Sequence, residues 1–375
     1  MSKINAKLLS AGILLSIIAL TISCKDKNST PSVPESIVAK IDTLLAQDDI
    51  EALTIGIVKQ DIVYKIHRGK LLTGETPNDQ TLYEIASLTK TFTGTLLAKA
   101  IVDGKVELEE DIRLYLPEKY PNLAYEGHPI TFKHLVTHQS GLPLIFPEKE
   151  GLLKEPIDWD KLPFEFNELQ ENFSKEQFFK SLRQFRLDTI PGIQFTYSNA
   201  GANLLGYLLE NIYEQSFDLL LEQYIFQPLE MTQSSIRLSE VNSNRLAKGL
   251  NMNKIEMPYR VEKAMNAEGG IISNVEDMIK YMRYHLNTSD ATVATSHQEL
   301  WEGQYGDYEA GLFWQIFKDG DQPDRIYQNG GAFGTSSWMT LIPELETAIF
   351  LVTNSSGQNV HQKLSEAADG ILSEL

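Results

Sequence analysis

Ser87 and Lys90 are the first residues of this sequence whose types and spacing could do chemistry together. They stand three positions apart in the stretch EIASLTKTFTG at 84–94. Three positions are close to one helical turn, so a helix would place both side chains on the same face. A serine hydroxyl is a weak nucleophile until a base takes its proton, and a lysine shielded from water can be that base. The same spacing also arises by chance. The predicted helices and strands around Ser87 must therefore show whether the two side chains could act together.

The elements around Ser87 predict an α+β protein with a long helical insertion. Apolar residues at helical spacing predict a first helix from Ile37 to Leu45, and β-branched runs at 53–58 and 62–66 predict a hairpin. Helical spacing then dominates from about residue 87 to 286. Within it we expect helices over 92–101, 178–185, 204–212 and 219–225, and one that starts at Ser273 with Glu276 completing a capping box.

Strand patterns return after the insertion. We expect strands at 310–317, 325–329, 336–342 and 347–353, followed by a last amphipathic helix over 360–375. Short turns between successive strands predict an antiparallel sheet whose two halves lie on either side of the insertion. Ser87 then lies where the chain leaves the sheet and enters its first long helix. At that position the helix dipole and the Ser87 backbone N–H can stabilise an oxyanion.

Composition limits the possible partners and the number of domains. The 375 residues are 42% hydrophobic, enough to bury a large core in one big domain or two medium ones. The 51 acidic residues outnumber the 33 basic ones, for a formal net charge of -18. This charge repels nucleic acid, so we expect no nucleic-acid partner.

The N-terminus predicts export and a lipid anchor. Lys3 and Lys7 precede an apolar run at 8–22, which predicts a signal peptide over 1–23. The end of this run, TISC at 21–24, resembles the lipobox of bacterial lipoproteins, although leucine is commoner at the position of its threonine. The resemblance implies that Cys24 is lipidated, and the alternative is a signal peptide that happens to end near a cysteine.

This prediction also divides the rest of the chain and gives its expected location. Residues 24–35 would be the lipidated cysteine and a polar tether, and 36–375 the folded domain. Cys24 is the only cysteine, so the mature domain would carry no disulfide. We expect the protein in the bacterial cell envelope, extracytoplasmic on the periplasmic or outer surface, with the membrane as a partner through its lipid.

From about residue 36 onward the chain resembles the serine hydrolases that include class C β-lactamases, penicillin-binding proteins (D,D-peptidases) and related esterases. YEIASLTKTFTG at 83–94 looks like the nucleophile helix of that family. The other similar segments, in the family's order, are ITFKHLVTHQSGLP at 130–143, PGIQFTYSNAGANLLGYLLE at 191–210, IFQPLEMT at 225–232, AEGGIISNVEDM at 267–278 and GLFWQIF at 311–317. The resemblance implies a β-lactamase/transpeptidase-like fold, with the active site between the sheet and the helical part.

The family's second motif is a tyrosine two residues before an asparagine. Three places fit, beginning at Tyr120, Tyr197 and Tyr327, and only Tyr197 has the family's surroundings, after Pro191-Gly192 and before a helix. The resemblance implies that the Tyr197 oxygen acts as a general base and that Asn199 donates to the substrate amide. Which of Lys90 and Tyr197 is the base stays open, because the two would titrate as a coupled pair.

The family's third motif, Lys-Thr-Gly or His-x-Gly, falls on Gln328-Asn329-Gly330 here. Gln328 therefore stands where relatives carry a cation that helps bind a substrate carboxylate, and a neutral amide loses that charge-assisted bond. The departure weakens the case for β-lactams and D-alanyl peptides and leaves esters and neutral amides. By the same alignment Gln328 and Gly330 contact the substrate, and the amides of Ser87 and Gly331 hold the oxyanion.

These observations predict a serine hydrolase that forms an acyl-enzyme with a small-molecule or peptide substrate. The substrate would be a β-lactam, a D-amino-acid peptide or a carboxylic ester. The chemistry needs no cofactor, and His134 and His138, although spaced for one helix face, lack a third ligand and predict no metal site. The alternative is a penicillin-binding or sensor-like protein of the same fold that acylates without turnover, or a pseudoenzyme.

Overall fold

The computed structural model describes residues 32–375, apart from 48, 149–151, 153–156, 241, 262–263, 303–307 and 321. The predicted signal peptide and Cys24 lie outside the described residues. The folded part begins with α1 (Glu35–Leu45) and ends with α10 (Val360–Leu372).

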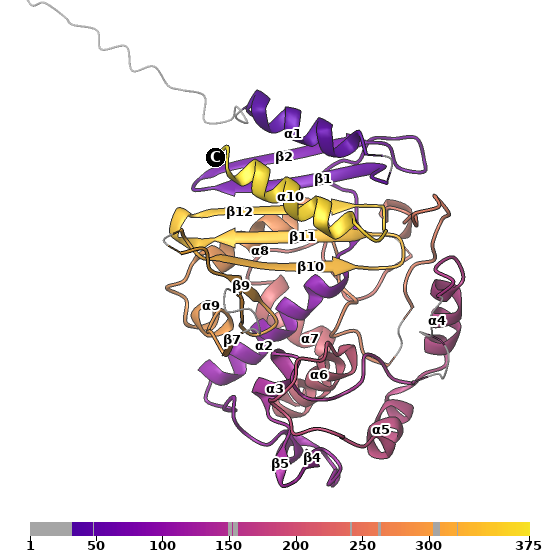
Figure 1. Cartoon of the computed structure of the whole chain (residues 1–375), viewed down its shortest axis with the longest axis vertical. Helices are drawn as coiled ribbons and strands as arrows, with labels where there is room; N and C mark the ends of the chain where they lie inside the picture. Colours follow the sequence, from indigo (N-terminus) through magenta and orange to yellow (C-terminus); the bar gives the residue numbers. More distant parts are fainter. Residues whose placement is uncertain are drawn as a thin grey trace, which may run out of the picture.

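An eight-stranded antiparallel sheet forms one half of the molecule (Figure 1). The first hairpin of the chain pairs with its last strand, because the strand order is β2-β1-β12-β11-β10-β9-β8-β7 and places β1 beside β12. The predicted first hairpin and the α+β fold with a helical insertion are thus confirmed. The strands are β1 (Ala52–Lys59), β2 (Ile62–Gly69), β7 (Trp301–Glu302), β8 (Tyr308–Ala310), β9 (Gln315–Phe317), β10 (Arg325–Gly331), β11 (Ser336–Ile342) and β12 (Thr347–Thr353).

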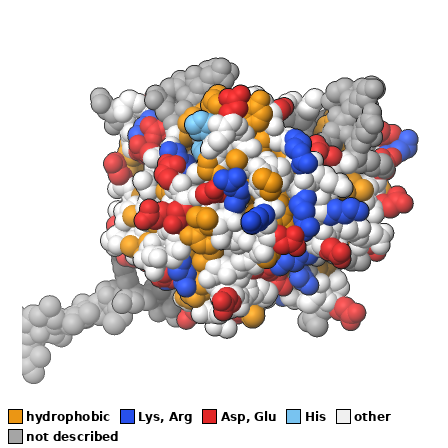
Figure 2. All heavy atoms as spheres, turned by 90° about the horizontal axis from the view of Figure 1, so that it is seen from below, with side chains coloured by type: hydrophobic (Ala, Val, Ile, Leu, Met, Phe, Trp, Pro, Cys, Tyr) orange, Lys and Arg blue, Asp and Glu red, His pale blue; other side chains and the backbone are white. Residues whose placement is uncertain are grey.

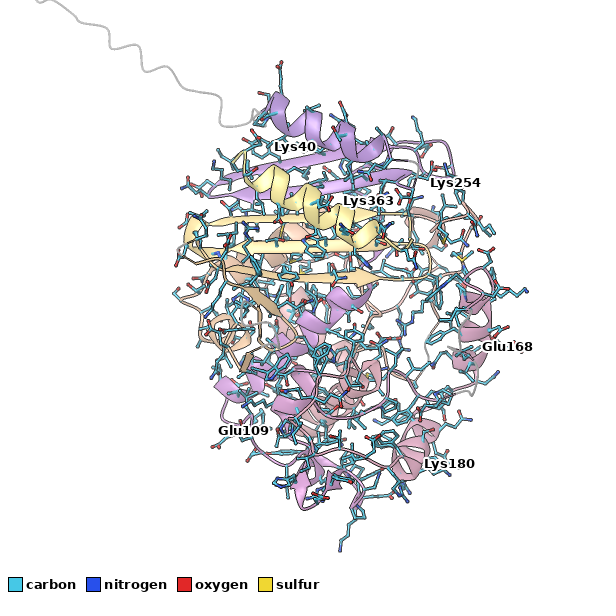
Figure 3. The ribbon with its side chains drawn as sticks, in the orientation of Figure 1. Lys40, Glu109, Glu168, Lys180, Lys254 and Lys363 are labelled. Atoms are coloured by element: carbon cyan, nitrogen blue, oxygen red, sulfur yellow. The ribbon has the colours of Figure 1, made fainter. Side chains whose placement is uncertain are left out.

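Helices cover both faces of the sheet. Apolar residues of α1 and α10, such as Ile41 and Leu364, pack in one cluster with Ile55 of β1 and Leu351 of β12. Two ion pairs reinforce this layer, Lys40 with Glu374 at 3.3 Å and Lys363 with Asp49 at 2.5 Å; both lysines are labelled in Figure 3. The helix α8 (Val275–Leu286) packs against β1 and β12 from the other face (Figure 1).

The chain between β2 and β7 builds the helical half below the sheet in Figure 1. Its central helix, α2 (Thr89–Val102), is buried on nearly all sides, and Phe92 stacks on Tyr281 of α8 at 3.8 Å. The remaining elements are β3 (Tyr83–Glu84), β4 (Ala124–Tyr125), β5 (His128–Pro129), α3 (Phe132–Val136), α4 (Leu162–Glu171), α5 (Lys175–Gln184), α6 (Asn199–Tyr213), α7 (Phe217–Leu221), β6 (Ile272–Ser273) and α9 (Ala291–Ser296).

Two local predictions are wrong. The strand expected over 310–317 is divided into β8 and β9, because the chain between them turns toward α2 and Phe313 takes a φ of +61°. Gly94 of α2 makes room for this turn, since a Cβ there would lie 2.2 Å from the Leu312 carbonyl oxygen. Ser273 does not cap α8, because it lies in β6; Asn274 is the cap, and its side chain accepts from the Asp277 N–H at 3.0 Å.

The surface of the helical half mixes charges of both signs. Figure 2, seen from below, shows Lys and Arg side chains interspersed with Asp and Glu, with apolar side chains between them. Among the described residues, no helix combines the length and the apolar character that crossing a bilayer requires.

Candidate active site

A strained turn presents Ser87 between the two halves of the molecule. The chain passes from β3 through a 3₁₀ turn at Ala86–Leu88 directly into α2. Ala86 is buried and has a φ of +50°, a conformation that costs a residue with a Cβ of order 1 kcal/mol or more. The preceding carbonyl, of Ile85, accepts from the Ser337 hydroxyl at 2.9 Å on β11. The sheet therefore fixes the turn that carries the serine.

Lys90 and Tyr197 both reach the Ser87 hydroxyl. Lys90 Nζ lies 3.0 Å from Ser87 Oγ, and the Tyr197 hydroxyl lies 2.8 Å from the same atom. Lys90 is completely buried, whereas Tyr197 is 36% exposed, and Lys90 Nζ lies 4.9 Å from the centroid of the tyrosine ring. The predicted helical spacing thus brings Ser87 and Lys90 together, and Tyr197, 110 positions from Ser87, completes the cluster.

His138 fixes the segment that carries Tyr197. Its carbonyl oxygen accepts from the Thr196 N–H at 2.7 Å, and its Nδ1 accepts from the Ser198 N–H at 3.2 Å. The imidazole packs on the Tyr197 ring with centroids 4.4 Å apart. Burial and the nearby charge of Lys90 lower the pKa of His138 to about 3, so the ring is neutral and accepts at Nδ1.

The two competing tyrosine motifs lie elsewhere. Tyr120 is buried in the core of the helical half, and Asn122 donates to the Leu182 carbonyl oxygen at 2.7 Å. Tyr327 stacks on Trp338 at 5.3 Å across two strands. Among the described residues the side chains bonded to the Ser87 hydroxyl are those of Lys90 and Tyr197, and neither Tyr120 nor Tyr327 takes part.

Asn199, at the start of α6, has a partly buried side chain. The preceding residue, Ser198, caps this helix by accepting from the Gly201 N–H at 2.8 Å. Asn199 Oδ1 is buried and has no hydrogen-bond partner among the described residues. A buried carbonyl oxygen without a partner is costly, and a donor on a bound ligand would satisfy it.

The end of β10 closes the site against the serine. A Cβ on Gly330 would lie 2.9 Å from the Ser87 nitrogen and 2.2 Å from the Ile85 carbonyl oxygen, so only glycine fits here. Gly331 follows and is exposed. His361 of α10 lies beside this end, with its Nε2 2.9 Å from the Gly330 carbonyl oxygen. Gly330 therefore packs directly against the backbone of the turn that carries Ser87.

Gln328 is buried, and its side-chain amide bonds mostly to protein groups. Its Nε2 donates to the Phe313 carbonyl oxygen at 2.6 Å, and its Oε1 accepts from Gln315 Nε2 at 3.0 Å and from the Asn329 N–H at 2.9 Å. These bonds leave one N–H of the amide for a ligand. The residue lines a small cavity of about 60 Å³ together with Tyr197 and His138.

The helix α3 holds His134 in a structural position. The His134 Nδ1 accepts from the Thr131 N–H at 3.2 Å, and the Thr131 side chain accepts from the His134 N–H, which together form a capping box. A Cβ on Gly192 would lie 2.7 Å from His134 Nε2. Both nitrogens of this imidazole are thus enclosed by neighbouring backbone.

A buried carboxylate, which the sequence did not predict, lies beside Lys90. Lys90 Nζ donates to the Glu268 carbonyl oxygen at 2.6 Å and lies 3.4 Å from Glu268 Oε2. Glu268 is completely buried, and its other carboxylate oxygen forms an ion pair with Arg260. The only signal in the sequence was a charged residue inside AEGG at 267–270.

A cavity of about 560 Å³ opens beside Gly331. Its wall is mostly apolar and includes Trp159, Met252 and Phe333, with Arg260 and His361 as its basic residues. The cavity adjoins the end of β10 that faces Ser87, so it can hold the part of a ligand beyond the reacting carbonyl.

The chain was compared with known proteins. A family model described as Beta-lactamase matches residues 37–371. The chain is similar to a β-lactamase of Escherichia coli K12, with 24% identity over 384 residues that cover 92% of this chain and 95% of the relative. It is also similar to the D-alanyl-D-alanine-carboxypeptidase/endopeptidase AmpH of the same strain, with 27% identity over 317 residues, 80% of this chain and 77% of the relative.

A solved structure shares the fold. The class C β-lactamase of Rhodobacter sphaeroides superposes with a TM-score of 0.75 at 18% identity, over 91% of this chain and 99% of that one.

Proposed function

Since this chain belongs to the β-lactamase family, we propose that it is a serine hydrolase that cleaves an ester or an amide through an acyl-enzyme on Ser87. The observation that carries this proposal is the position of one serine hydroxyl between two proton-transfer groups, Lys90 at 3.0 Å and Tyr197 at 2.8 Å. Both distances lie in the range that general acid–base catalysis requires.

In this mechanism Ser87 Oγ attacks the carbonyl carbon while Tyr197 or Lys90 takes its proton and passes it to the leaving group. The same groups then activate a water that releases the acyl group. The amides of Ser87 and Gly331 hold the oxyanion, which the close contact between Gly330 and the Ser87 nitrogen supports. No cofactor takes part.

Asn199 and Gln328 orient the substrate in this proposal, and Gly330 lets its backbone approach β10. The partnerless oxygen of Asn199 supports a ligand donor at that position. Gln328 offers one N–H and no charge, so it favours a neutral ester or amide over a carboxylate-bearing substrate. The relatives named above keep β-lactams and D-alanyl peptides among the candidates.

A small substrate panel tests the proposal. Purified wild-type protein and Ser87→Ala would be assayed on a p-nitrophenyl ester, a chromogenic cephalosporin and a peptide ending in D-Ala-D-Ala. We expect turnover of the ester that disappears in Ser87→Ala. A stable adduct on Ser87 in the mass spectrum without turnover would instead support a penicillin-binding or sensor-like protein, and neither turnover nor adduct would support a pseudoenzyme.

A matched variant tests the role of Gln328. Gln328→Lys places the cation that relatives carry beside the site, so it should raise kcat/KM on the cephalosporin and the D-alanyl peptide relative to the ester. An unchanged substrate ratio would show that Gln328 does not select the substrate.

We also propose that the protein is an envelope lipoprotein anchored through Cys24, with residues 1–23 removed as a signal peptide. The layout of the first 24 residues supports this. Cells fed a radiolabelled fatty acid should label the wild-type protein but not Cys24→Ser, and the variant should appear in the soluble fraction. Equal labelling of both proteins would contradict the anchor.

A further inference from the structure

Two cavities lie along strand β10, one on each side of the turn that carries Ser87. Gln328 lines the small cavity beside Tyr197. Two residues later, Gly330 packs against the turn, since a Cβ there would lie 2.9 Å from the Ser87 nitrogen. The next residue, Gly331, lines the cavity of about 560 Å³. Because a strand advances about 3.3 Å per residue, this order along β10 places Ser87 between the two cavities.

The acyl group of a substrate would extend into the large cavity in the proposed mechanism. A proton must reach the leaving group from Lys90 or Tyr197, and neither residue lines the large cavity. Tyr197 lines the small cavity instead, so the leaving group departs on that side of Ser87. The acyl group, which stays on Ser87 in the intermediate, then points toward Gly331 and the large cavity.

The open part of the large cavity has an apolar wall. Trp159 is 57% exposed and Met252 is 55% exposed, so both side chains can contact a ligand. Leu162 and Pro163 of α4 and Phe333 after β10 extend the apolar lining. An apolar group that fills this space removes all these side chains from water. The volume lies within the range of about 300 to 1,000 Å³ that is typical of sites for small molecules.

Two polar residues of this wall already bond to other parts of the protein. Asn251 Nδ2 donates to Asp160 at 2.6 Å, and Asn251 Oδ1 accepts from two backbone N–H groups, both at 3.0 Å. The Ser356 hydroxyl donates to the Phe333 carbonyl oxygen at 2.8 Å. These side chains therefore gain little from a polar ligand.

The basic side chains of the wall also have protein partners. The Arg260 guanidinium forms an ion pair with buried Glu268 and lies 5.1 Å from the centre of the Phe166 ring. His361 Nε2 lies 2.9 Å from the Gly330 carbonyl oxygen, which can only accept. A carboxylate on the acyl group would have to compete with Glu268 for Arg260, whereas an uncharged group disturbs neither contact.

The helix α4, at one flank of the molecule in Figure 1, carries part of this wall and is fixed on both sides. Asp160, just before the helix, accepts from Asn251 Nδ2 at 2.6 Å. Asn167, within the helix, donates to the Tyr259 carbonyl oxygen at 2.7 Å and accepts from the Val261 N–H at 3.0 Å. The cavity is thus formed before a ligand binds, which lowers the cost of binding.

We infer that the large cavity is the acyl subsite of this hydrolase and that it selects an uncharged, apolar acyl group longer than acetyl. The substrates are then neutral esters or amides of apolar carboxylic acids. Trp159, Met252 and Phe333 determine this specificity through their contacts with the acyl group. This inference rests on the proposed hydrolase function.

A series of p-nitrophenyl esters tests the inference, because the leaving group stays the same while the acyl group lengthens. We expect kcat/KM to rise about threefold for each methylene from acetate to hexanoate, at least about thirtyfold in all. The mono-p-nitrophenyl ester of adipic acid matches the hexanoate in length but ends in a carboxylate. It should be hydrolysed at least about tenfold less efficiently than the hexanoate. A flat series, or equal hydrolysis of the adipate and hexanoate esters, would overturn the inference.

A charge placed in the wall tests the location of the acyl group. Met252→Glu changes an exposed side chain, and it should lower the ratio of kcat/KM on hexanoate to kcat/KM on acetate at least about tenfold. Leu345→Glu is the matched control, because Leu345 is also an exposed apolar residue and follows the end of β11 opposite to the cavity. The control should keep the wild-type ratio. If Met252→Glu keeps it too, the acyl group does not lie in this cavity.

A binding measurement separates this inference from the hydrolase function. Ser87→Ala cannot form the acyl-enzyme, so it can be titrated with methyl hexanoate and methyl acetate while tryptophan fluorescence is recorded. The contribution of Trp159 is identified with Trp159→Phe in the same background. We expect methyl hexanoate, and not methyl acetate at equal concentration, to change the Trp159 signal. Such binding without turnover of any ester would contradict the hydrolase function and keep the apolar site. An unchanged signal would overturn the inference even if esters are hydrolysed.

Discussion

Glu84 should make the stability of this protein depend on pH in an unusual direction. The carboxyl group is buried, and burial raises its pKa to about 7, although the N–H and the guanidinium of Arg260 both lower it. The ordinary value is 4.5. Between these two values the folded protein binds a proton that the unfolded chain has released. The free energy of unfolding therefore falls as the pH rises through this range and levels off above about 7.

The size of the effect follows from the two pKa values. Because proton binding is linked to folding, a shift of this size lowers the free energy of unfolding by about 2.5 kcal/mol between about pH 5 and about pH 8 for this one group. Glu84→Gln keeps an oxygen to accept from the Arg260 N–H at 3.0 Å and has no proton to release. The variant should therefore gain stability over wild type by roughly that amount across the same range.

Urea unfolding at several pH values measures this difference. Glu168→Gln is the matched control, because Glu168 is an exposed glutamate on α4, labelled in Figure 3. The control should run parallel to wild type at every pH. If Glu84→Gln also runs parallel to wild type, the buried carboxyl group does not titrate in this range and the reasoning from its burial is wrong.

Three further predictions concern the site. Tyr197→Phe should lower kcat/KM by about 10²- to 10⁴-fold in steady-state assays with an unchanged melting temperature, because only the hydroxyl 2.8 Å from Ser87 is lost; a change of less than threefold would remove Tyr197 from proton transfer. Gly330→Ala should abolish activity, since its Cβ would lie 2.2 Å from the Ile85 carbonyl oxygen, and circular dichroism with an activity assay would show whether the fold survives. His138→Asn should resist acid better than wild type, because burial lowers the pKa of His138 to about 3 and the folded state loses stability as the pH falls below about 6.5; equal acid sensitivity by urea titration would contradict this.

Local sequence patterns predicted two kinds of site residue: those close to each other in the sequence, and those with characteristic flanking residues. Ser87 and Lys90 meet because three residues make nearly one helical turn. Tyr197 was separable from Tyr120 and Tyr327 by the proline, glycine and helix around it, and the structure brings Tyr197 alone of the three to the serine. The family and the fold class, predicted from the motifs and their order, are both confirmed.

The missed features depend on contacts between distant segments. Glu268 lies 178 positions from Lys90, and no spacing rule links them. The sequence also did not predict that Gln328 donates to the Phe313 carbonyl oxygen, because a turn exposes that oxygen in a segment whose apolar pattern predicted an unbroken strand. The spacing of apolar residues shows which face of a segment is buried. It does not show where a buried segment bends, as this one does where Leu312 packs against Gly94.

The strand order also constrains when this protein can fold. Leu53 pairs with Thr353, 300 positions later, so the first hairpin has no central partner until β12 has been synthesised. β12 lies between β1 and β11, and α10, which covers them, comes later still. A ribosome must therefore finish nearly the whole chain before the sheet can close, and contacts of such long range fold slowly. A truncation of the last thirty or so residues would remove β12 from inside the sheet rather than trim its edge, and it would leave β11, which holds the turn that carries Ser87, without one of its two neighbouring strands.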